Sequence, residues 1–464
     1  MKMFPASTYI ERRRRLKEDL KSGILLFLGN EQSPINYPDN GYAFRQDSSF
    51  LYYWGIELAG LAAIIDVDQD RETVFGRDVT IEDIIWSGSR TTLKEHCLAA
   101  GVENNLSLDQ LEVNLQAALQ KGRSIHFLPQ YRPENLIKIQ QLLGLNVAVV
   151  NQHVSPAFIK AVVGQRSIKT AEEIQQIEAA LDVTFDMQTL AMKISRPGLH
   201  EKETVGAMAG LAYSRVSSVL AYPIIFTTRG HILHNPHHEN VMQANDMVIN
   251  DSGCESAMHY ASDITRTFPV GGKFSEKQKE IYSILLKAQI NAIEGVRPGI
   301  AYKEIHIATA RNLAMDIKAL GLMKGDVDEA VAAGAHALFF PHGLGHMLGL
   351  DVHDMEDLGE NFVGYTDTIQ RNPQFGICHL RLAKKLESGF VITVEPGLYF
   401  IPELIDQWKA AKRFEEFIDY DKVETYRDFG GIRIEDDVLV VDGGQRVLGR
   451  PIPKSIDAVE ELSS

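Results

Sequence analysis

The segment HGLGHMLGLDVHD, from His342 to Asp354, brings three histidines and two aspartates close together. His342 and His346 are four residues apart, a spacing that on a helix would place both imidazoles on one face, as in HExxH zinc sites. The interspersed glycines instead favour a loop that lies close against other backbone. Such a loop could present His342, His346 and His353 separately, one as a metal ligand and the others for proton transfer or contact with a substrate carbonyl.

Four acidic residues in the second half of the chain lie within or directly after apolar, β-branched runs. In DMVINDSG, Asp251 follows a strand pattern, and in SDITRTFPV, Asp263 lies in a Thr-rich strand at a separation that suits an antiparallel return. In FVITVEPG, Glu395 ends a strand. Across GGIRIEDDVLVV, read as one strand, alternation places Arg433 and Glu435 opposite the isoleucines. The two aspartates are expected to face each other.

The four acidic residues could be ordinary turn residues or metal ligands, and their charges help to decide between these two interpretations. A single acid after a strand usually belongs to a turn. Glu395 and Glu435, however, are embedded among apolar residues, where an unpaired carboxylate is costly. If four carboxylates converge, each close pair repels by roughly 4 kcal/mol at an effective dielectric near 20, more than Arg433 alone can offset. Two divalent cations would balance them, and oxygen ligands with one imidazole suit Mn²⁺, Co²⁺ or Fe²⁺ and also admit Zn²⁺.

A second histidine-rich segment, GHILHNPHHEN, contributes further candidates. It contains His231, His234, His237 and His238. Most of these are expected at the surface. His234 follows an apolar Ile-Leu pair. It is therefore the member of this segment that we expect to reach the site.

The composition is that of a globular protein without affinity for polyanions. The 464 residues are 45% hydrophobic, with a formal net charge of -15. Nucleic acids and anionic membranes attract basic surfaces, so we expect neither as a partner. The three cysteines lack metal-type spacing, the N-terminus lacks a signal-peptide core, and no apolar run approaches the roughly 20 residues that span a bilayer. We therefore expect a cytoplasmic protein.

The elements that must position these residues fall into two domains. From about residue 23 to 150, the apolar runs GILLFLG, LAAIIDVD, RETVFG and SIHFLPQ alternate with helical patterns, which predicts an α/β layer structure. Thr170 and Glu173 form a capping box that predicts a long helix over residues 171–194. Helices and strand-turn-strand patterns follow, as in an α+β domain. We place the domains at residues 1–168 and 169–464.

One charge run in the first domain needs its own interpretation. The basic residues Arg12 to Arg15 stand behind a capping box of Thr8 and Glu11, with leucines following at helical spacing. The run could be a patch for an anionic ligand. We instead expect a solvated helix face, the usual environment of such runs.

Five segments, in this order, resemble the metal-binding motifs of the aminopeptidase P and prolidase family, the proline peptidases of the pita-bread fold: DSGCE, SDITRTFPV, HGLGHMLGLDVHD, TVEPGLYF and GGIRIEDD. YAFRQDSSFLYYWG, near residues 43–55, is also similar to the N-terminal domain of that family. The resemblance spans most of the chain. It implies an α+β pita-bread metallopeptidase domain preceded by a smaller α/β domain.

The resemblance also implies roles for individual residues. Two divalent metal ions, with Mn²⁺ expected and Co²⁺, Zn²⁺ or Fe²⁺ as alternatives, would be ligated by Asp251, Asp263, His346, Glu395 and Glu435. A hydroxide bridging the metals would attack the peptide carbonyl, with Glu395 shuttling the proton. His342 and His353 would line the active site, with His353 near the substrate carbonyl, and His234 and Arg433 would bind substrate.

The implied substrates are peptides with proline at the second position, whose scissile bond is a tertiary amide without an N–H group. Aminopeptidase P removes the first residue of longer peptides, and this is the activity we expect. Prolidase, which cleaves only dipeptides, is the alternative, because the segment between TVEPGLYF and GGIRIEDD is long and Arg381 stands where a prolidase would bind the substrate carboxylate. A metal-free binding homologue is a third interpretation, against which the complete ligand set argues.

The family also implies a homo-oligomer, a dimer or tetramer. Trp86, in DIIWSGSR, is one candidate for a contact with the cleft of a neighbouring subunit. A half-exposed aromatic side chain in a loop is the other interpretation of Trp86.

Overall fold

The computed structural model describes residues 3–215 and 219–463. The chain divides into two compact units. Unit 1 comprises Met1–Arg166 and Met355–Phe362, and unit 2 comprises Ser167–Asp354 and Val363–Ser464. Within the described ranges, no helix is long and apolar enough to cross a membrane.

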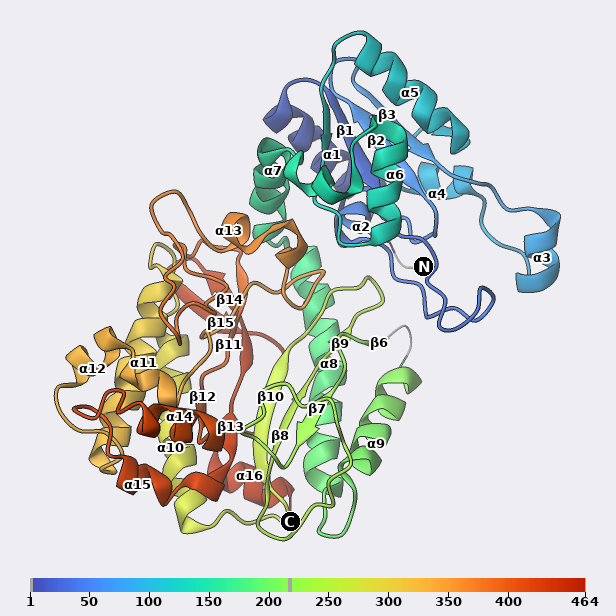
Figure 1. Ribbon diagram of the computed structural model, residues 1–464. Helices are drawn as coiled ribbons and strands as arrows, with labels where there is room; N and C mark the ends of the chain where they lie inside the picture. The colour runs from blue at the N-terminus through green and yellow to red at the C-terminus, as the bar shows by residue number, and fades with distance from the viewer. Residues whose placement is uncertain (1–2, 216–218, 464) are drawn as a thin grey trace. The chain divides into compact units, whose positions relative to one another are not determined.

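Unit 1 is built on a five-stranded mixed sheet in the order β4-β3-β2-β1-β5. Strands β1, β2 and β3 of this sheet are labelled in Figure 1. Strands β1, β2 and β3 pair antiparallel, whereas β5 is parallel to β1 and β4 is parallel to β3. The strands are β1 (Ile24–Leu28), β2 (Ala62–Asp66), β3 (Arg71–Phe75), β4 (Asn104–Leu106) and β5 (Ile125–Phe127). Every residue of β1 and β2 is buried, which explains why both strands are apolar runs in the sequence apart from Asp66 at the end of β2. The four strands predicted from the apolar runs are present.

Helices complete the core of unit 1. They are α1 (Ala6–Leu20), α2 (Ser48–Trp54), α3 (Ile81–Ser87), α4 (Leu93–Ala99), α5 (Asp109–Gln120), α6 (Pro133–Leu143), the 3-10 helix η1 (Val147–Gln152) and α7 (Pro156–Ser167). Leu115 of α5 and Ile139 of α6 join Leu26, Ile64 and Phe75 of the sheet in one buried cluster. The members of this cluster are all apolar.

The basic run in α1 differs from the expectation. Arg12 and Arg13 are 5% and 0% exposed, whereas Arg14 and Arg15 form ion pairs at the surface. Arg12 Nη1 donates to the carbonyl of Tyr52, and Arg13 Nη1 donates to the next carbonyl in the last turn of α2. Carbonyl groups at a helix end lack partners within the helix. The predicted solvated face is therefore wrong for two of the four arginines, because they satisfy the end of a neighbouring helix.

Unit 2 begins with the long helix that the capping box predicts. Thr170 accepts a hydrogen bond from the Glu173 backbone, and the Glu173 side chain accepts one from the Thr170 backbone. The helices of unit 2 are α8 (Ala171–Ile194), α9 (Glu201–Ser214), α10 (Glu276–Gly295), α11 (Tyr302–Ala319), α12 (Val327–Ala333), α14 (Pro402–Ala410), α15 (Tyr420–Glu424) and α16 (Ile456–Leu462), with 3-10 helices η2 (Ala335–Leu338) and η4 (Arg427–Phe429). Near the second boundary of the units lie η3 (Glu356–Leu358) and α13 (Glu360–Val363).

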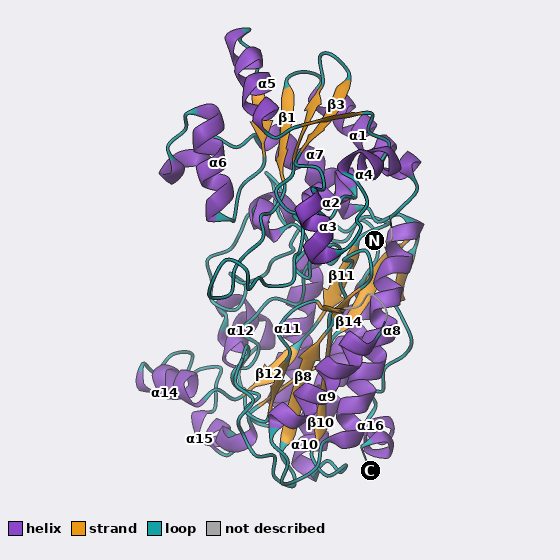
Figure 2. Cartoon of the chain, turned by 90° about the vertical axis from the view of Figure 1, so that its right-hand side faces the viewer, coloured by secondary structure: helices purple, strands orange, loops and turns teal. Residues whose placement is uncertain are grey.

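The strands of unit 2 form small antiparallel sheets in the orders β10-β8-β7, β11-β14-β15, β12-β13 and β6-β9. Helix α8 packs against β8 and β10, and α10 packs against β11, β12 and β13 (Figure 2). The strands are β6 (Val219–Leu220), β7 (Ile225–Thr227), β8 (Met247–Ser252), β9 (Cys254–Glu255), β10 (Ile264–Pro269), β11 (Val391–Val394), β12 (Gly397–Tyr399), β13 (Gly431–Arg433), β14 (Asp436–Val441) and β15 (Gly444–Val447). Sheets flanked by helices are the α+β arrangement expected.

The segment GGIRIEDDVLVV differs from the single strand expected. It is interrupted between β13 and β14, which belong to different sheets. At the interruption the backbone N–H of Glu435 donates to the carbonyl of Thr265, 3.0 Å away in β10. This tertiary hydrogen bond satisfies the backbone where the ladder stops.

Candidate metal centre

The two aspartates are held together by an antiparallel strand pair. Asp251 lies in β8, and Asp263 directly precedes β10, whose Ile264 pairs with Ser252. The hydroxyl of Tyr222 lies 2.7 Å from Asp251 Oδ1 and 2.5 Å from Asp263 Oδ1. One hydroxyl thus links both carboxylates, which face each other as predicted.

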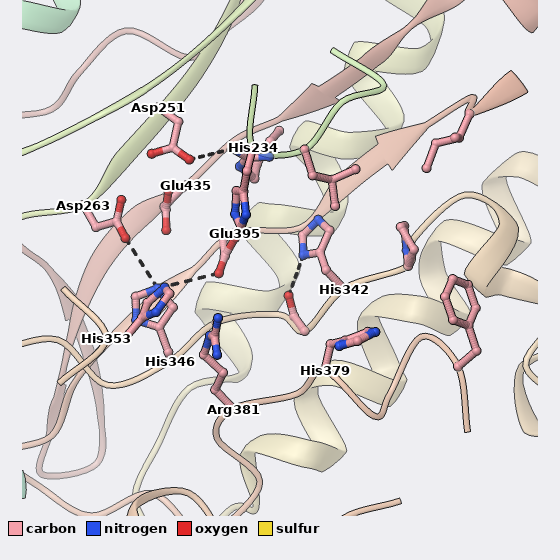
Figure 3. A pocket seen from close by; sticks show the side chains of 17 residues that line it. His234, Asp251, Asp263, His342, His346, His353, His379, Arg381, Glu395 and Glu435 are labelled. Carbon is pink, nitrogen blue, oxygen red and sulfur yellow. Dashed lines mark hydrogen bonds and ion pairs between the residues drawn. The ribbon is translucent and has the colours of Figure 1, made fainter. Parts of the chain in front are cut away.

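The two glutamates approach the aspartates from other strands. Glu395 follows β11, and its backbone N–H donates to the carbonyl of Leu344 at 2.8 Å. Glu435 lies at the interruption between β13 and β14, where its Oε2 accepts a 2.7 Å hydrogen bond from Thr265 Oγ1. Figure 3 shows the four carboxylates directed toward one space. Three strand ends and one strand interior therefore supply the acidic groups.

His346 completes the constellation from the glycine-rich segment, which contains neither helix nor regular strand in residues 342–354. A Cβ at Gly345 would lie 2.1 Å from the Thr393 carbonyl, so glycine lets this segment press against β11. His346 Nδ1 lies 3.0 Å from the Met347 carbonyl and must donate to it, which leaves Nε2 for other bonds. Nε2 lies 3.4 Å from Asp263 Oδ2 and 3.8 Å from Glu395 Oε1.

These separations suit ligands around a shared ion. Atoms that each lie about 2.0–2.2 Å from a metal ion are roughly 3 Å or more apart from one another. One ligand atom each from Asp263, His346 and Glu435 lie within 4.8 Å of one another. Oxygen donors with one imidazole are the donor set that divalent transition metals accept. The residues present therefore fit a divalent cation.

The electrostatics of the site point the same way. Burial raises the pKa of Asp251, and burial together with the nearby carboxylates raises that of Glu435 well above the usual value. Burial raises the pKa of Glu395 to about 7. Burial also acts to raise the pKa of Asp263, but the hydrogen bond with His346 lowers it on balance. Raised carboxyl pKa values mean that the chain leaves negative charge uncompensated, which a bound cation would relieve.

All of the predicted site residues line one cavity of about 410 Å³. These are His234, Asp251, Asp263, His342, His346, His353, Arg381, Glu395, Arg433 and Glu435. The other histidines of GHILHNPHHEN do not line it. Leu233, Pro341, Phe375 and Ile401 add apolar surface. The cavity thus combines a charged end with apolar walls, as substrate sites commonly do.

A hydrogen-bonded chain connects His342 to the carboxylates. His342 Nδ1 lies 2.8 Å from the Gly343 carbonyl and donates to it, so Nε2 accepts from the Tyr399 hydroxyl at 2.9 Å. Arg433 donates to the same hydroxyl at 2.9 Å and to Asp251 Oδ2 at 2.6 Å. Burial, with a contribution from Arg433, lowers the pKa of His342 to about 3, so its imidazole is neutral.

Several contributors were missed by the sequence analysis. Tyr222 stands alone in a segment without a chemical pattern, and its role depends on a strand pair that brings it to two distant aspartates. Tyr399 belongs to the quoted motif TVEPGLYF, so its position in that motif could have indicated it. His379 and Phe375 line the cavity from a segment without helix or strand, where no periodicity could point to them.

The antiparallel sheets with flanking helices and the buried site of acids and histidines define a pita-bread metallopeptidase. The chain belongs to metallopeptidase family M24, whose model matches residues 175–442, and residues 9–126 match the aminopeptidase P N-terminal domain. The family and the fold class expected from the motifs are confirmed.

Full-length relatives carry two different names. A probable Xaa-Pro aminopeptidase of Aspergillus clavatus is 31% identical over 99% of this chain and 98% of its own length. A Homo sapiens Xaa-Pro dipeptidase is 29% identical over 98% of this chain and 93% of its own. The zinc-substituted structure of Escherichia coli aminopeptidase P in complex with product superimposes with a TM-score of 0.80 at 28% identity, covering 100% of this chain and 99% of that one.

Proposed function

We propose that this chain is a Xaa-Pro aminopeptidase, which hydrolyses the bond between the first residue of a peptide and a proline at the second position. The observation that carries the proposal is the convergence of four carboxylates and His346 in one cavity, where three of the four carboxyl groups have raised pKa values. Full-length similarity to a probable Xaa-Pro aminopeptidase supports the substrate class.

The metal centre we propose holds two divalent ions, with Mn²⁺ as the native metal. Its ligands would be Asp251, Asp263, His346, Glu395 and Glu435. Two such ions would balance four carboxylates and, when bound, would polarise the peptide carbonyl and provide a nucleophile from water near pH 7. The alternative of a metal-free binding protein would leave the same carboxylates without compensation.

The surrounding side chains would orient the substrate and move protons. We propose that Glu395, with a pKa of about 7 in the protein alone, exchanges a proton with the attacking water. His353 would donate to the oxyanion that forms on the substrate carbonyl, while neutral His342 lines the substrate cavity. His234 and Arg433 would contact the substrate from the same cavity. Because the nitrogen of a bond before proline carries no hydrogen, the wall of the substrate cavity need not accept a hydrogen bond from the scissile amide.

Hydrolysis of two substrates side by side tests the function. A Xaa-Pro-Xaa tripeptide and a Xaa-Pro dipeptide are incubated with the Mn²⁺-loaded protein, with Glu395→Ala as the blank. Release of the first residue from the tripeptide is expected. A protein that carries Mn²⁺ and cleaves neither peptide would contradict the proposal.

A prolidase is the second candidate, because Arg381 lines the cavity and could bind the carboxylate of a dipeptide. The human relative is a Xaa-Pro dipeptidase. Under this alternative, Arg381→Met raises KM for the dipeptide at least tenfold and leaves tripeptide cleavage unchanged, on the scale of a charge-assisted hydrogen bond. An equal effect on both peptides would remove the alternative.

We further propose a domain boundary near residue 168, a cytoplasmic location and a homo-oligomer, dimer or tetramer. Trp86 is 81% exposed on α3, beside Ile81 and Ile85, which are 73% and 72% exposed. Such an apolar helix face supports a role in subunit contacts. Light scattering of wild type and Trp86→Lys tests it, and a wild-type monomer would contradict the oligomer.

A further inference from the structure

The two ends of the glycine-rich segment are anchored differently. The backbone N–H of His346 donates to Thr393 Oγ1 at 3.1 Å, and the Thr393 N–H donates to the His346 carbonyl at 3.0 Å. These bonds fasten His346 to β11, next to Glu395. His353 lies at the far end of the segment, and its ring packs against that of His346 with centroids 4.4 Å apart (Figure 3). The hydrogen bonds of His346 to β11 do not hold the part of the segment that carries His353, so other contacts must hold it.

Asp354 closes that far end. Its backbone N–H donates to the Met347 carbonyl at 2.9 Å, and its Oδ1 accepts from the backbone N–H of Asp351 at 3.3 Å. The carboxylate packs so tightly that a Cβ at Gly349 would lie 2.4 Å from Asp354 Oδ2. Residues 347–354 therefore form a small closed loop, and His353 is the residue next to the closure.

Lys169 holds the carboxylate that makes this closure. Its Nζ lies 2.8 Å from Asp354 Oδ2, and both side chains are 1% exposed. The Lys169 backbone N–H donates to the Gly389 carbonyl at 2.8 Å, and the Gly389 N–H donates to Val440 of β14 at 2.9 Å. The Lys169 backbone is thus fixed next to β11 and β14, the strand pair after which Glu395 follows. A buried pair is costly to break, because the remaining charge stays out of water.

We propose that Lys169 and Asp354 are positioning residues that hold His353 at the metal centre. The inference rests on the proposed function, in which His353 acts on the substrate carbonyl. The pair also joins the two ends of Ser167–Asp354, the segment after which the chain leaves unit 2. A displacement of about 1 Å at a reacting group can reduce turnover about 10²-fold, so the tether is placed where small movements matter.

Lys169→Met tests the proposal. We expect kcat to fall about 10- to 100-fold, with KM within about threefold of wild type. Bound Mn²⁺ stays at the wild-type content, because His346 and the carboxylates have their own anchors. In the chelated, metal-free protein, where no paramagnetic ion broadens the signal, the ring signal of His353 in ¹⁵N-histidine NMR shifts. Lys169→Arg keeps the charge and restores part of kcat.

The neutral double variant Lys169→Met/Asp354→Asn separates positioning from stability. It removes both charges, so Tm recovers relative to the single variant, whereas kcat stays low because the tether is absent. Recovery of kcat together with Tm would overturn the proposal, as would loss of bound Mn²⁺ in Lys169→Met. Arg13→Lys, which weakens a buried ion pair with Glu72 in unit 1, is the matched control and lowers Tm without changing kcat. Wild-type activity tests the proposed function, and the ratio of variant to wild type tests this inference.

Discussion

In the sheet unit at the N-terminus, buried charges are matched within the chain. Arg13 donates to Glu72, and Arg123 donates to Asp66. Burial acts to raise the pKa of Asp66, but Arg123 lowers it on balance. In the candidate metal centre of unit 2, burial raises the pKa of Asp251, Glu395 and Glu435 instead. The contrast between the two sites indicates that several carboxylates are buried together where a bound cation balances their charge.

The largest effect that this contrast predicts is on turnover. Glu435→Ala removes one carboxylate from the centre, and we expect activity to fall about 10³-fold or more, since metal ions contribute several kcal/mol of transition-state stabilisation. Steady-state kinetics in excess Mn²⁺ measure it. Asp66→Ala, at the matched charge of unit 1, is the control and retains kcat. If the activity of Glu435→Ala fell less than tenfold, the proposed difference between the metal centre and the matched charges of unit 1 would be contradicted.

A smaller effect is expected from the hydroxyl that joins the aspartates. Tyr222→Phe removes the hydrogen bonds to Asp251 and Asp263. We expect Mn²⁺ affinity to fall about 10- to 100-fold, the range observed for residues that orient metal ligands. Isothermal titration calorimetry measures the affinity. Unchanged affinity would mean that the strands alone position the aspartates.

Neutralising a buried carboxylate should destabilise the metal-free protein in unit 1 but not at the candidate metal centre. Asp66→Asn leaves the Arg123 guanidinium without its charged partner and lowers the free energy of unfolding by about 1–3 kcal/mol. Glu435 has a raised folded pKa, so it opposes folding as pH rises, and Glu435→Gln is neutral or stabilising at pH 8. Urea unfolding in chelator measures both variants. The same sign for both would contradict the contrast.

The smallest effect concerns two buried histidines outside the cavity. Burial lowers the pKa of His306 to about 3 and of His336 to about 4. In the unfolded chain each histidine binds a proton below its pKa of about 6.5, whereas in the folded protein it stays neutral. Each histidine therefore lowers the free energy of unfolding by about 1.4 kcal/mol per pH unit as pH falls from 6.5 toward 4. Unfolding free energies across this range should show a shallower slope for His336→Leu. An unchanged slope would count against a buried neutral His336.

How far the sequence predicts this molecule depends on the range of the interactions involved. The histidine segment and the acids after apolar runs can be predicted, because the residues next to each of them in the sequence form a recognisable strand or loop pattern. Arg12 and Arg13 were misjudged, because the carbonyl groups that they satisfy come from another helix. Tyr222 was not found for the same reason. The interruption before β14 depends on a hydrogen bond to Thr265 in β10, which no local pattern contains.

Metal stoichiometry tests the central claim most directly. Chelated protein is titrated with Mn²⁺ while binding heat and cleavage of a Xaa-Pro-Xaa tripeptide are followed together. We predict two Mn²⁺ ions per chain, with cleavage rising as the site fills. A chain that binds no Mn²⁺, or that cleaves the tripeptide at full rate in chelator, would contradict the claim that the buried carboxylates exist to hold metal.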